Sequence, residues 1–211
     1  MQTNALSEEQ LANITEAIYQ HGYGIIPDFF DTEFIQQLTQ RVIESNALKK
    51  AGIGRQLNHQ RNSDIRRDAI LWLNNEHPTD QKYLAQMEAI RVTLNRQLFM
   101  GLFDYESHFA HYSKGAFYKK HLDAFKGRSN RVLTTVAYLD NHWKPGDGGE
   151  LSLYSEQDEL IAQVPPKAGT FVVFLSDEFP HEVHTCHDDR YSIAGWFRIN
   201  TSHSAKVDPP R

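Results

Sequence analysis

The chain has 211 residues, of which 40% are hydrophobic and 23% are charged, a composition typical of a globular protein with a single domain, residues 1–211. Its net charge of −5 excludes the basic character of a nucleic-acid-binding domain, so no nucleic-acid partner is expected. The single cysteine, Cys186, excludes an internal disulfide framework and a cysteine-rich zinc module.

Residues 1–104 are predicted to be mostly helical. Ser7, with Gln10 three residues later, matches a capping box, and Gly22 fits the position that ends the helix. A short β-rich run, YGIIPDFF, follows, and Asp31 is expected to cap a second helix. The apolar residues of this second helix recur at helical spacing: Phe34, Ile35, Leu38, Val42 and Ile43.

Residues 48–67 break this pattern. They have no apolar periodicity, and they carry two glycines and six basic residues against one aspartate. Such a segment is uncommon inside a compact domain unless it is a functional lid or disordered, and its composition leaves both alternatives open. A strand is predicted over 68–73 and a long amphipathic helix over 79–100. The apolar stripe of this helix comprises Leu84, Met87, Ile90, Leu94 and Leu98.

From Tyr105 the periodicity changes from helical to alternating. Eight short strands are expected, over 105–112, 116–123, 131–140, 150–154, 159–164, 169–175, 181–186 and 190–199. This pattern favours a double-sheet jelly roll or a related barrel. We therefore predict an α+β, mainly β fold. Its double-stranded β-helix (cupin-like) core would span 105–198, buttressed by the N-terminal helices and followed by a polar tail over 199–211.

A histidine and a carboxylate, His121 and Asp123, are separated by one residue on a predicted strand. Residues i and i+2 of a strand project to the same face, so both side chains are expected to point into one space. His181 begins a later strand, in the segment FPHEVH. Two histidines and one carboxylate form the facial triad of non-haem Fe(II) oxygenases, which leaves open positions for substrate and dioxygen.

Arg190 lies nine positions after His181, on the next predicted strand. Its guanidinium can bind a carboxylate bidentately, and a barrel interior would otherwise have no reason to hold an arginine. The joint spacing of these residues favours metal and carboxylate binding over a chance alternation of polar side chains. His184 is expected to face away from the metal.

With these motifs the chain resembles the iron- and 2-oxoglutarate-dependent dioxygenases, and within them the prolyl 4-hydroxylases of the hypoxia-inducible-factor type. The resemblance is dense over 65–197, in the segments IRRDAILWL, HYSKGAFYKKHLD, RVLTTVAYLDNHW, GGELSLY and FPHEVHTCHDDRYSIAGWF. It implies Fe(2+), O2 and the cosubstrate 2-oxoglutarate, with ascorbate as reductant. It also implies hydroxylation of a prolyl residue in a protein or peptide, coupled to oxidative decarboxylation of 2-oxoglutarate.

The resemblance implies a role for each site residue. The iron ligands would be His121, Asp123 and His181. Cosubstrate contacts would come from Arg190, Tyr138, Tyr112 and Trp196, with Arg190 on the C5 carboxylate. Substrate contacts would come from Arg131, Arg66, Asp68, Tyr118 and Val183, and the loop 48–67 would fold over the substrate. The chain departs from the animal enzymes at Ala194, where they place a threonine beside the cosubstrate.

Two other functions remain open on the sequence alone. The chain could hydroxylate a small molecule, or it could be a cupin-like metal-binding module without oxygenase activity. For a protein substrate, a prolyl residue of a translation elongation factor is the candidate that bacterial relatives of this type imply. A monomer in the cytoplasm, without membrane contact, is expected. The first ten residues show no secretory pattern, and no run of about 18 apolar residues occurs.

Overall fold

The structure is a computed structural model that describes residues 5–45, 47–50, 64–124 and 129–201. Helix α1 (Glu8–His21) begins with the predicted capping box. The Ser7 hydroxyl accepts a hydrogen bond from the Gln10 backbone N–H at 3.1 Å, and the Gln10 side chain accepts one from the Ser7 N–H at 2.8 Å. The helix ends at Gly22, whose φ of 72° is in the left-handed region that glycine adopts without strain. Both predicted ends are confirmed.

Within the described residues, two further helices follow, α2 (Thr32–Ile43) and α3 (Pro78–Leu98). Asp31 caps α2 as predicted, because its carboxylate accepts a hydrogen bond from a backbone N–H of the first turn at 2.8 Å. The predicted stripe on α2 is wrong at Ile43, which is 59% exposed at the last position of the helix, while its other four members are buried. On α3 the middle of the predicted stripe is buried. No helix in the described ranges is both long enough and apolar enough to cross a bilayer.

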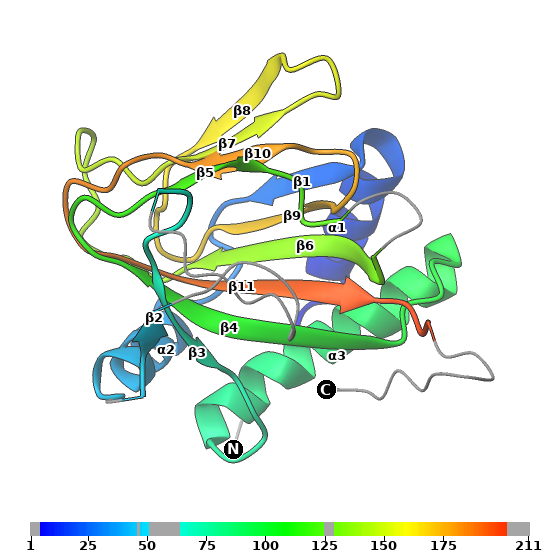
Figure 1. The fold of residues 1–211 in the computed structure, drawn as a ribbon. Helices are drawn as coiled ribbons and strands as arrows, with labels where there is room; N and C mark the ends of the chain where they lie inside the picture. Colours follow the sequence, from blue (N-terminus) through cyan, green and yellow to red (C-terminus); the bar gives the residue numbers. More distant parts are fainter. Residues whose placement is uncertain (1–4, 46, 51–63, 125–128, 202–211) are drawn as a thin grey trace.

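The strands form two antiparallel sheets that lie face to face (Figure 1). The larger sheet has the order β1-β9-β6-β11-β4-β3-β2. Its strands are β1 (Tyr23–Ile26), β2 (Lys49–Lys50), β3 (Ala69–Trp72), β4 (Asp104–Tyr112), β6 (Arg131–Tyr138), β9 (Phe171–Leu175) and β11 (Arg190–Arg198). The smaller sheet has the order β5-β10-β7-β8, with β5 (Tyr118–His121), β7 (Leu151–Tyr154), β8 (Leu160–Val164) and β10 (His181–Val183). Each strand predicted beyond Tyr105 is present, so the predicted mainly β architecture is confirmed.

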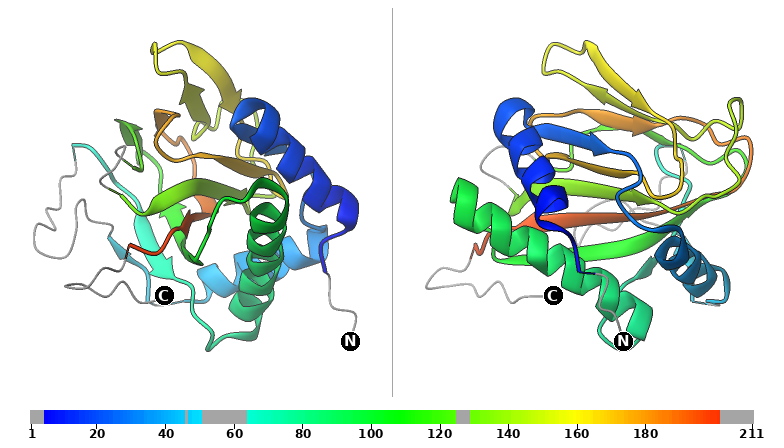
Figure 2. Two further views of the ribbon diagram at one scale, coloured as in Figure 1. Left: turned by 90° about the vertical axis from the view of Figure 1, so that its right-hand side faces the viewer. Right: turned by 180° about the vertical axis from the view of Figure 1, so that it is seen from behind.

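Alternation along the central strands of the larger sheet divides the interior into two cores. One set of side chains, including Leu133, Phe171 and Ile193, packs with the three helices. The alternate set, including Tyr138 and Val172, packs with the smaller sheet. Figure 2 shows α1 and α3 against the face of the larger sheet that is turned away from the smaller sheet. The space between the sheets therefore lies on the opposite side of the larger sheet from α1 and α3.

The segment predicted as an unstructured loop over 48–67 is structured at both ends. Its first residues form β2, which pairs with β3. Near its other end, Arg66 forms an isolated bridge with Tyr118 at the edge of β5. The prediction is wrong for these residues because both ends find backbone partners at sheet edges. Residues 51–63 lie outside the described residues, as do 202–211 of the predicted tail.

A buried ion pair between Arg198 and Asp104 joins the end of β11 to the start of β4. We expect Asp104→Ala to lower the free energy of unfolding by about 3 kcal/mol, because it removes the carboxylate that the buried guanidinium faces. Glu88→Ala is the matched control. Glu88 pairs with Arg91 at the surface and is 56% exposed, where an ion pair contributes at most about 1 kcal/mol. Urea unfolding measures both losses, and equal losses would contradict the prediction.

Candidate metal centre

Three side chains with metal-ligating atoms converge between the two sheets. His121 is the last residue of β5 and His181 is the first residue of β10, and the two are paired directly across these strands. Asp123 Oδ1 lies 3.6 Å from His121 Nε2, and Asp123 Oδ2 lies 3.5 Å from His181 Nε2. The three ligand atoms all lie within 4.8 Å of one another, and no other such group occurs in the described part of the chain. The predicted ligands form one site.

Strand alternation, which predicted the His121–Asp123 pair, is not what brings it together. β5 ends at His121, and Asp123 lies in the bend that follows. Two donors hold its carboxylate there: the Thr134 hydroxyl and the Trp196 indole N–H donate to Asp123 Oδ2 at 2.8 and 2.9 Å. Sequence reasoning missed Thr134. Two adjacent threonines in an otherwise apolar central strand, RVLTTVAY, are the signal that could have indicated it.

Backbone carbonyls fix the orientation of both imidazoles. His121 Nδ1 lies 2.7 Å from the Lys119 carbonyl oxygen, and His181 Nδ1 lies 3.1 Å from that of Phe179. Because a carbonyl oxygen only accepts, Nδ1 is the protonated nitrogen of each neutral ring, and Nε2 keeps the lone pair that faces the site. Hydrogen bonds of this kind hold ligating histidines in one tautomer.

The protonation states of this triad suit a divalent cation. Burial lowers the pKa of His181 to about 4, so the ring is neutral near pH 7. Burial alone would raise the pKa of Asp123, but His181, His121 and Arg131 nearby hold it well below its usual range. Neutral imidazole and ionised carboxylate are the forms that bind metal. Two imidazoles and one carboxylate are the donor set of non-haem Fe(II) sites, so the residues fit Fe(2+).

A buried cation lies on the face of the larger sheet that is turned toward the smaller sheet. Arg190 is 3% exposed, and its guanidinium carbon lies 4.9 and 5.0 Å from the ring centres of Tyr112 and Tyr138. It donates to the Ser192 hydroxyl at 3.1 Å. None of the ion pairs among the described residues involves Arg190.

Two buried polar atoms around the Arg190 guanidinium lack a hydrogen-bond partner in the described part of the chain. Within the described residues, neither Arg190 Nε nor the Tyr138 hydroxyl has a hydrogen-bond partner. A buried guanidinium without an anion is unfavourable, and buried polar groups are normally satisfied. The pocket therefore fits a ligand that carries a carboxylate, as 2-oxoglutarate does.

Gly149 makes room for this arginine. Its φ is 75°, and a Cβ at this position would lie 2.9 Å from Arg190 Cδ and 3.0 Å from Cys186 Sγ. The backbone conformation and the close approach both require glycine here. Burial raises the pKa of the Cys186 thiol to about 11, so this cysteine is a small apolar core residue.

Arg131, a predicted substrate contact, and Trp196, a predicted cosubstrate contact, contact each other. The Arg131 guanidinium carbon lies 3.5 Å from the Trp196 ring centre, and Arg131 Nη2 lies 3.0 Å from Glu106 Oε1. Trp196 lies six residues along β11 from Arg190 and donates to Asp123. The structure thus places Trp196 against a metal ligand, and its contact with the cosubstrate stays a prediction. Substrate contact by Arg131, whose side chain is 27% exposed, stays a prediction.

The predicted substrate residues Arg66 and Asp68 form a bidentate ion pair with distances of 2.5 and 2.7 Å. Arg66 also lies over the Tyr118 ring at 4.8 Å, and its Nη2 lies 3.2 Å from His108 Nε2. His108 in turn stacks on Trp196, with the ring centres 5.4 Å apart. These residues therefore form one network beside the triad, and their contact with a substrate stays a prediction.

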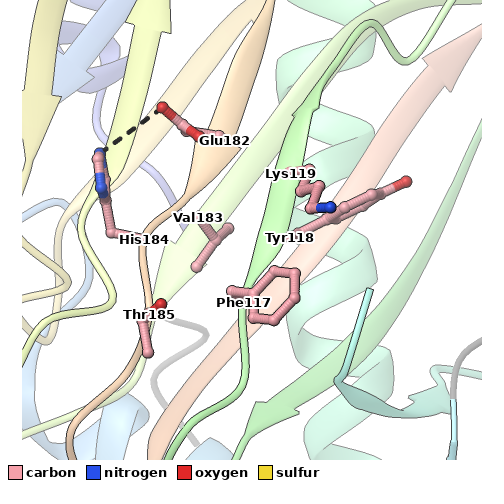
Figure 3. Close-up of a pocket in the computed structure, with 7 residues that line it drawn as sticks. All are labelled: Phe117, Tyr118, Lys119, Glu182, Val183, His184 and Thr185. Atoms are coloured by element: carbon pink, nitrogen blue, oxygen red, sulfur yellow. Dashed lines mark ion pairs between the residues drawn. The ribbon is translucent and has the colours of Figure 1, made fainter. Parts of the chain in front are cut away.

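A groove of about 310 Å³ follows the line where β5 and β10 run side by side (Figure 3). Tyr118 and Val183, both predicted to contact the substrate, line it. The Tyr118 ring stacks on the ligand His121 with 3.6 Å between ring centres, so the groove borders the triad. His184 Nε2 lies 2.7 Å from the Ser152 hydroxyl oxygen on β7, so this ring contacts the neighbouring strand and not the triad, as predicted.

The described geometry agrees with comparisons to known proteins. The model of the 2OG-Fe(II) oxygenase superfamily matches residues 107–198, which contain the triad and Arg190. The chain is similar to a Pseudomonas putida prolyl-4-hydroxylase of known crystal structure, with 35% sequence identity and a TM-score of 0.80. The match covers 90% of this chain and 98% of that chain. The chain belongs to the 2OG-Fe(II) oxygenase superfamily. The family resemblance and the double-stranded β-helix fold predicted from the sequence are both confirmed.

Two further relatives of this oxygenase come from animals. Human "Egl nine homolog 1" is 27% identical over 210 residues, which are 93% of this chain and 49% of that protein. The chain thus spans about half the length of that curated relative. A prolyl hydroxylase from Trichoplax adhaerens, solved with a hypoxia inducible factor oxygen degradation domain peptide fragment, shares the fold. Its TM-score is 0.81 at 21% identity, over 90% of each chain.

We expect Arg190→Ala to weaken 2-oxoglutarate binding about 100-fold, because a carboxylate would enter a buried pocket without its charged partner. Tyr138→Phe removes one hydroxyl and should weaken binding about ten-fold. Calorimetric titration of 2-oxoglutarate into protein loaded with Mn²⁺ measures both, with Arg96→Ala at an exposed position of α3 as the control. An unchanged affinity in Arg190→Ala would place the anchor elsewhere.

A pH-dependent stability follows from His108. Burial, with Arg66 and Arg131 nearby, lowers its pKa well below the ordinary 6.5. Stability that depends on a neutral His108 is therefore fully present above about pH 6.5. It is lost as the pH falls below that value, because the unfolded chain then binds a proton at His108 that the folded protein does not bind. Urea unfolding of metal-free protein between about pH 7 and pH 5 should show a steeper loss in the wild type than in His108→Phe. Identical slopes would contradict this assignment.

Proposed function

We propose that this oxygenase is a protein prolyl 4-hydroxylase, which couples oxidative decarboxylation of 2-oxoglutarate to hydroxylation of a prolyl residue. The observation that carries the proposal is the buried, unpaired Arg190 on the sheet face that also meets the metal triad. The identity of 35% with the Pseudomonas putida prolyl-4-hydroxylase supports the prolyl class. Superfamily membership argues against a cupin-like module without oxygenase activity.

The residues of the chain divide the work between binding and shielding. Bound Fe(2+), together with 2-oxoglutarate and O2, would supply the oxidation of the unactivated carbon. The triad would hold the metal from one side and leave its other positions open. Arg190 and the Tyr138 hydroxyl would bind the far carboxylate of 2-oxoglutarate, with the Tyr112 ring beside the guanidinium. Apolar neighbours such as Val136 and Phe174 exclude water from this space.

The groove between β5 and β10 supports a polypeptide substrate over a small molecule. It is open at the surface, where two of its lining residues, Lys119 and Thr185, are exposed. It borders His121 through the stacked ring of Tyr118. An extended chain lying in this groove could present a proline to the triad, whereas a small molecule would be enclosed by few of these residues.

The finer expectations are proposals that belong to this function. We propose that a prolyl residue of a translation elongation factor is the substrate, and the identity with a bacterial prolyl-4-hydroxylase favours a bacterial type of substrate. We propose that ascorbate acts as reductant and that the chain works as a monomer in the cytoplasm. The single cysteine, which leaves no internal disulfide, suits a reducing compartment.

The test is mass spectrometry of an elongation-factor peptide after incubation with the chain, Fe(2+), 2-oxoglutarate and air. We expect a mass increase of one oxygen atom on proline in the wild type. Asp123→Ala should show no detectable product, because it removes the one anionic ligand, and Glu88→Ala should match the wild type. If the wild type does not decarboxylate 2-oxoglutarate, the oxygenase proposal fails. If it does so only with small molecules, the substrate class is wrong.

A further inference from the structure

We propose that Trp196 and Thr134 are positioning residues for the metal ligand Asp123. Their hydrogen bonds occupy Oδ2 and leave Oδ1 as the oxygen that binds the metal. The inference rests on the metal site of the proposed function, and it gives Trp196 and Thr134 a role that acts through Asp123.

The two oxygens of Asp123 have different surroundings. Oδ2 accepts hydrogen bonds from Trp196 Nε1 at 2.9 Å and from Thr134 Oγ1 at 2.8 Å. A carboxylate oxygen has about two lone-pair positions, so these donors occupy both. Oδ1 faces His121 Nε2 at 3.6 Å, the nitrogen whose lone pair is directed at the site. Oδ2 lies 3.5 Å from His181 Nε2, but its two hydrogen bonds leave it no lone pair, so Oδ1 is the oxygen with lone pairs available to a metal.

The direction of the hydroxyl bond is fixed by its neighbour. Thr134 Oγ1 also lies 2.9 Å from the Ser176 hydroxyl oxygen, and both residues are at most 1% exposed. An ionised carboxylate only accepts hydrogen bonds. The Thr134 hydroxyl therefore donates its hydrogen bond to Asp123 and accepts one from the Ser176 hydroxyl. This buried relay holds the threonine hydroxyl in the orientation that faces Oδ2.

The indole is held as firmly as the hydroxyl. The Arg131 guanidinium carbon lies 3.5 Å from the Trp196 ring centre, and Glu106 anchors Arg131 at 3.0 Å. His108 stacks on the same indole with 20° between the ring planes. Because these contacts fix the ring, the N–H points at Asp123 without a loss of entropy on metal binding. The carboxylate is thereby preorganised.

A purely structural role would also place an acceptor near a buried indole N–H and a buried hydroxyl, since such groups need partners. The two explanations differ in the metal affinity that they predict for the variants. A positioning role predicts a loss of metal affinity when either donor is removed, whereas a structural role predicts a loss of stability alone.

The experiment is titration of the metal-free full chain with Mn²⁺ alone, followed by the electron paramagnetic resonance signal of free Mn²⁺. Trp196→Phe keeps an aromatic ring and removes the N–H, and Thr134→Val keeps the shape and removes the hydroxyl. Each should raise the Mn²⁺ dissociation constant about ten-fold. Thr134→Ser, which keeps the hydroxyl, should stay within about two-fold of the wild type and so rescue binding. Trp72→Phe is the matched control, because the Trp72 ring contacts the same His108 in a tilted arrangement, with 5.1 Å between ring centres.

Wild-type affinity in both Trp196→Phe and Thr134→Val would overturn the inference, and so would equal losses in Thr134→Val and Thr134→Ser. If Trp196→Phe does not fold, the comparison of Thr134→Val with Thr134→Ser tests the inference by itself. Failure of the proposed function looks different: wild-type protein would bind Mn²⁺ only with Asp123 intact and yet hydroxylate no peptide. A wild type that binds no Mn²⁺ would overturn both.

Discussion

The register of three central strands is the constraint on which the rest of the structure depends. Along β6, β9 and β11, alternate side chains belong to the helical core and to the space between the sheets. A shift of one residue would exchange these two sets and would bury Arg190 against the helices. The same register places Arg190 opposite Tyr112 on β4 and Trp196 opposite Thr134 on β6. Packing of the two cores therefore also assembles the site.

This assembly concentrates charge where apolar contacts would otherwise dominate. A buried carboxylate at Asp123 is acceptable because two donors and the nearby histidines stabilise its ionised form. Arg190 has no anionic partner among the described residues, so a bound ligand would supply the carboxylate that stabilises its charge. The fold thus satisfies the metal side of the site by itself and leaves the anion side to be completed on binding.

Much of this could be predicted from the sequence because the signals were local. Helix caps, turn residues and the change from helical to alternating periodicity depend on neighbouring residues, and they placed α1, α2 and the strands beyond Tyr105. The triad and Arg190 were predicted from their spacing and from a resemblance to a family. The bend that carries Asp123, the Thr134 hydroxyl and the contact between Arg131 and Trp196 depend on strands distant in sequence. No local pattern encodes such pairs, so strand alternation predicts the convergence of His121 and Asp123 for the wrong reason.

The space between the two sheets is proposed to bind Fe(2+) through ligands from the smaller sheet and 2-oxoglutarate through Arg190 of the larger sheet. Anaerobic visible spectroscopy tests this central claim most directly, because 2-oxoglutarate chelated to Fe(2+) gives a charge-transfer band that neither component shows alone. We predict that the band forms in the wild type, fails to form in Asp123→Ala, and requires much higher 2-oxoglutarate concentrations in Arg190→Ala. A wild type without the band, or an Arg190→Ala variant that saturates at the wild-type concentration, would contradict the account.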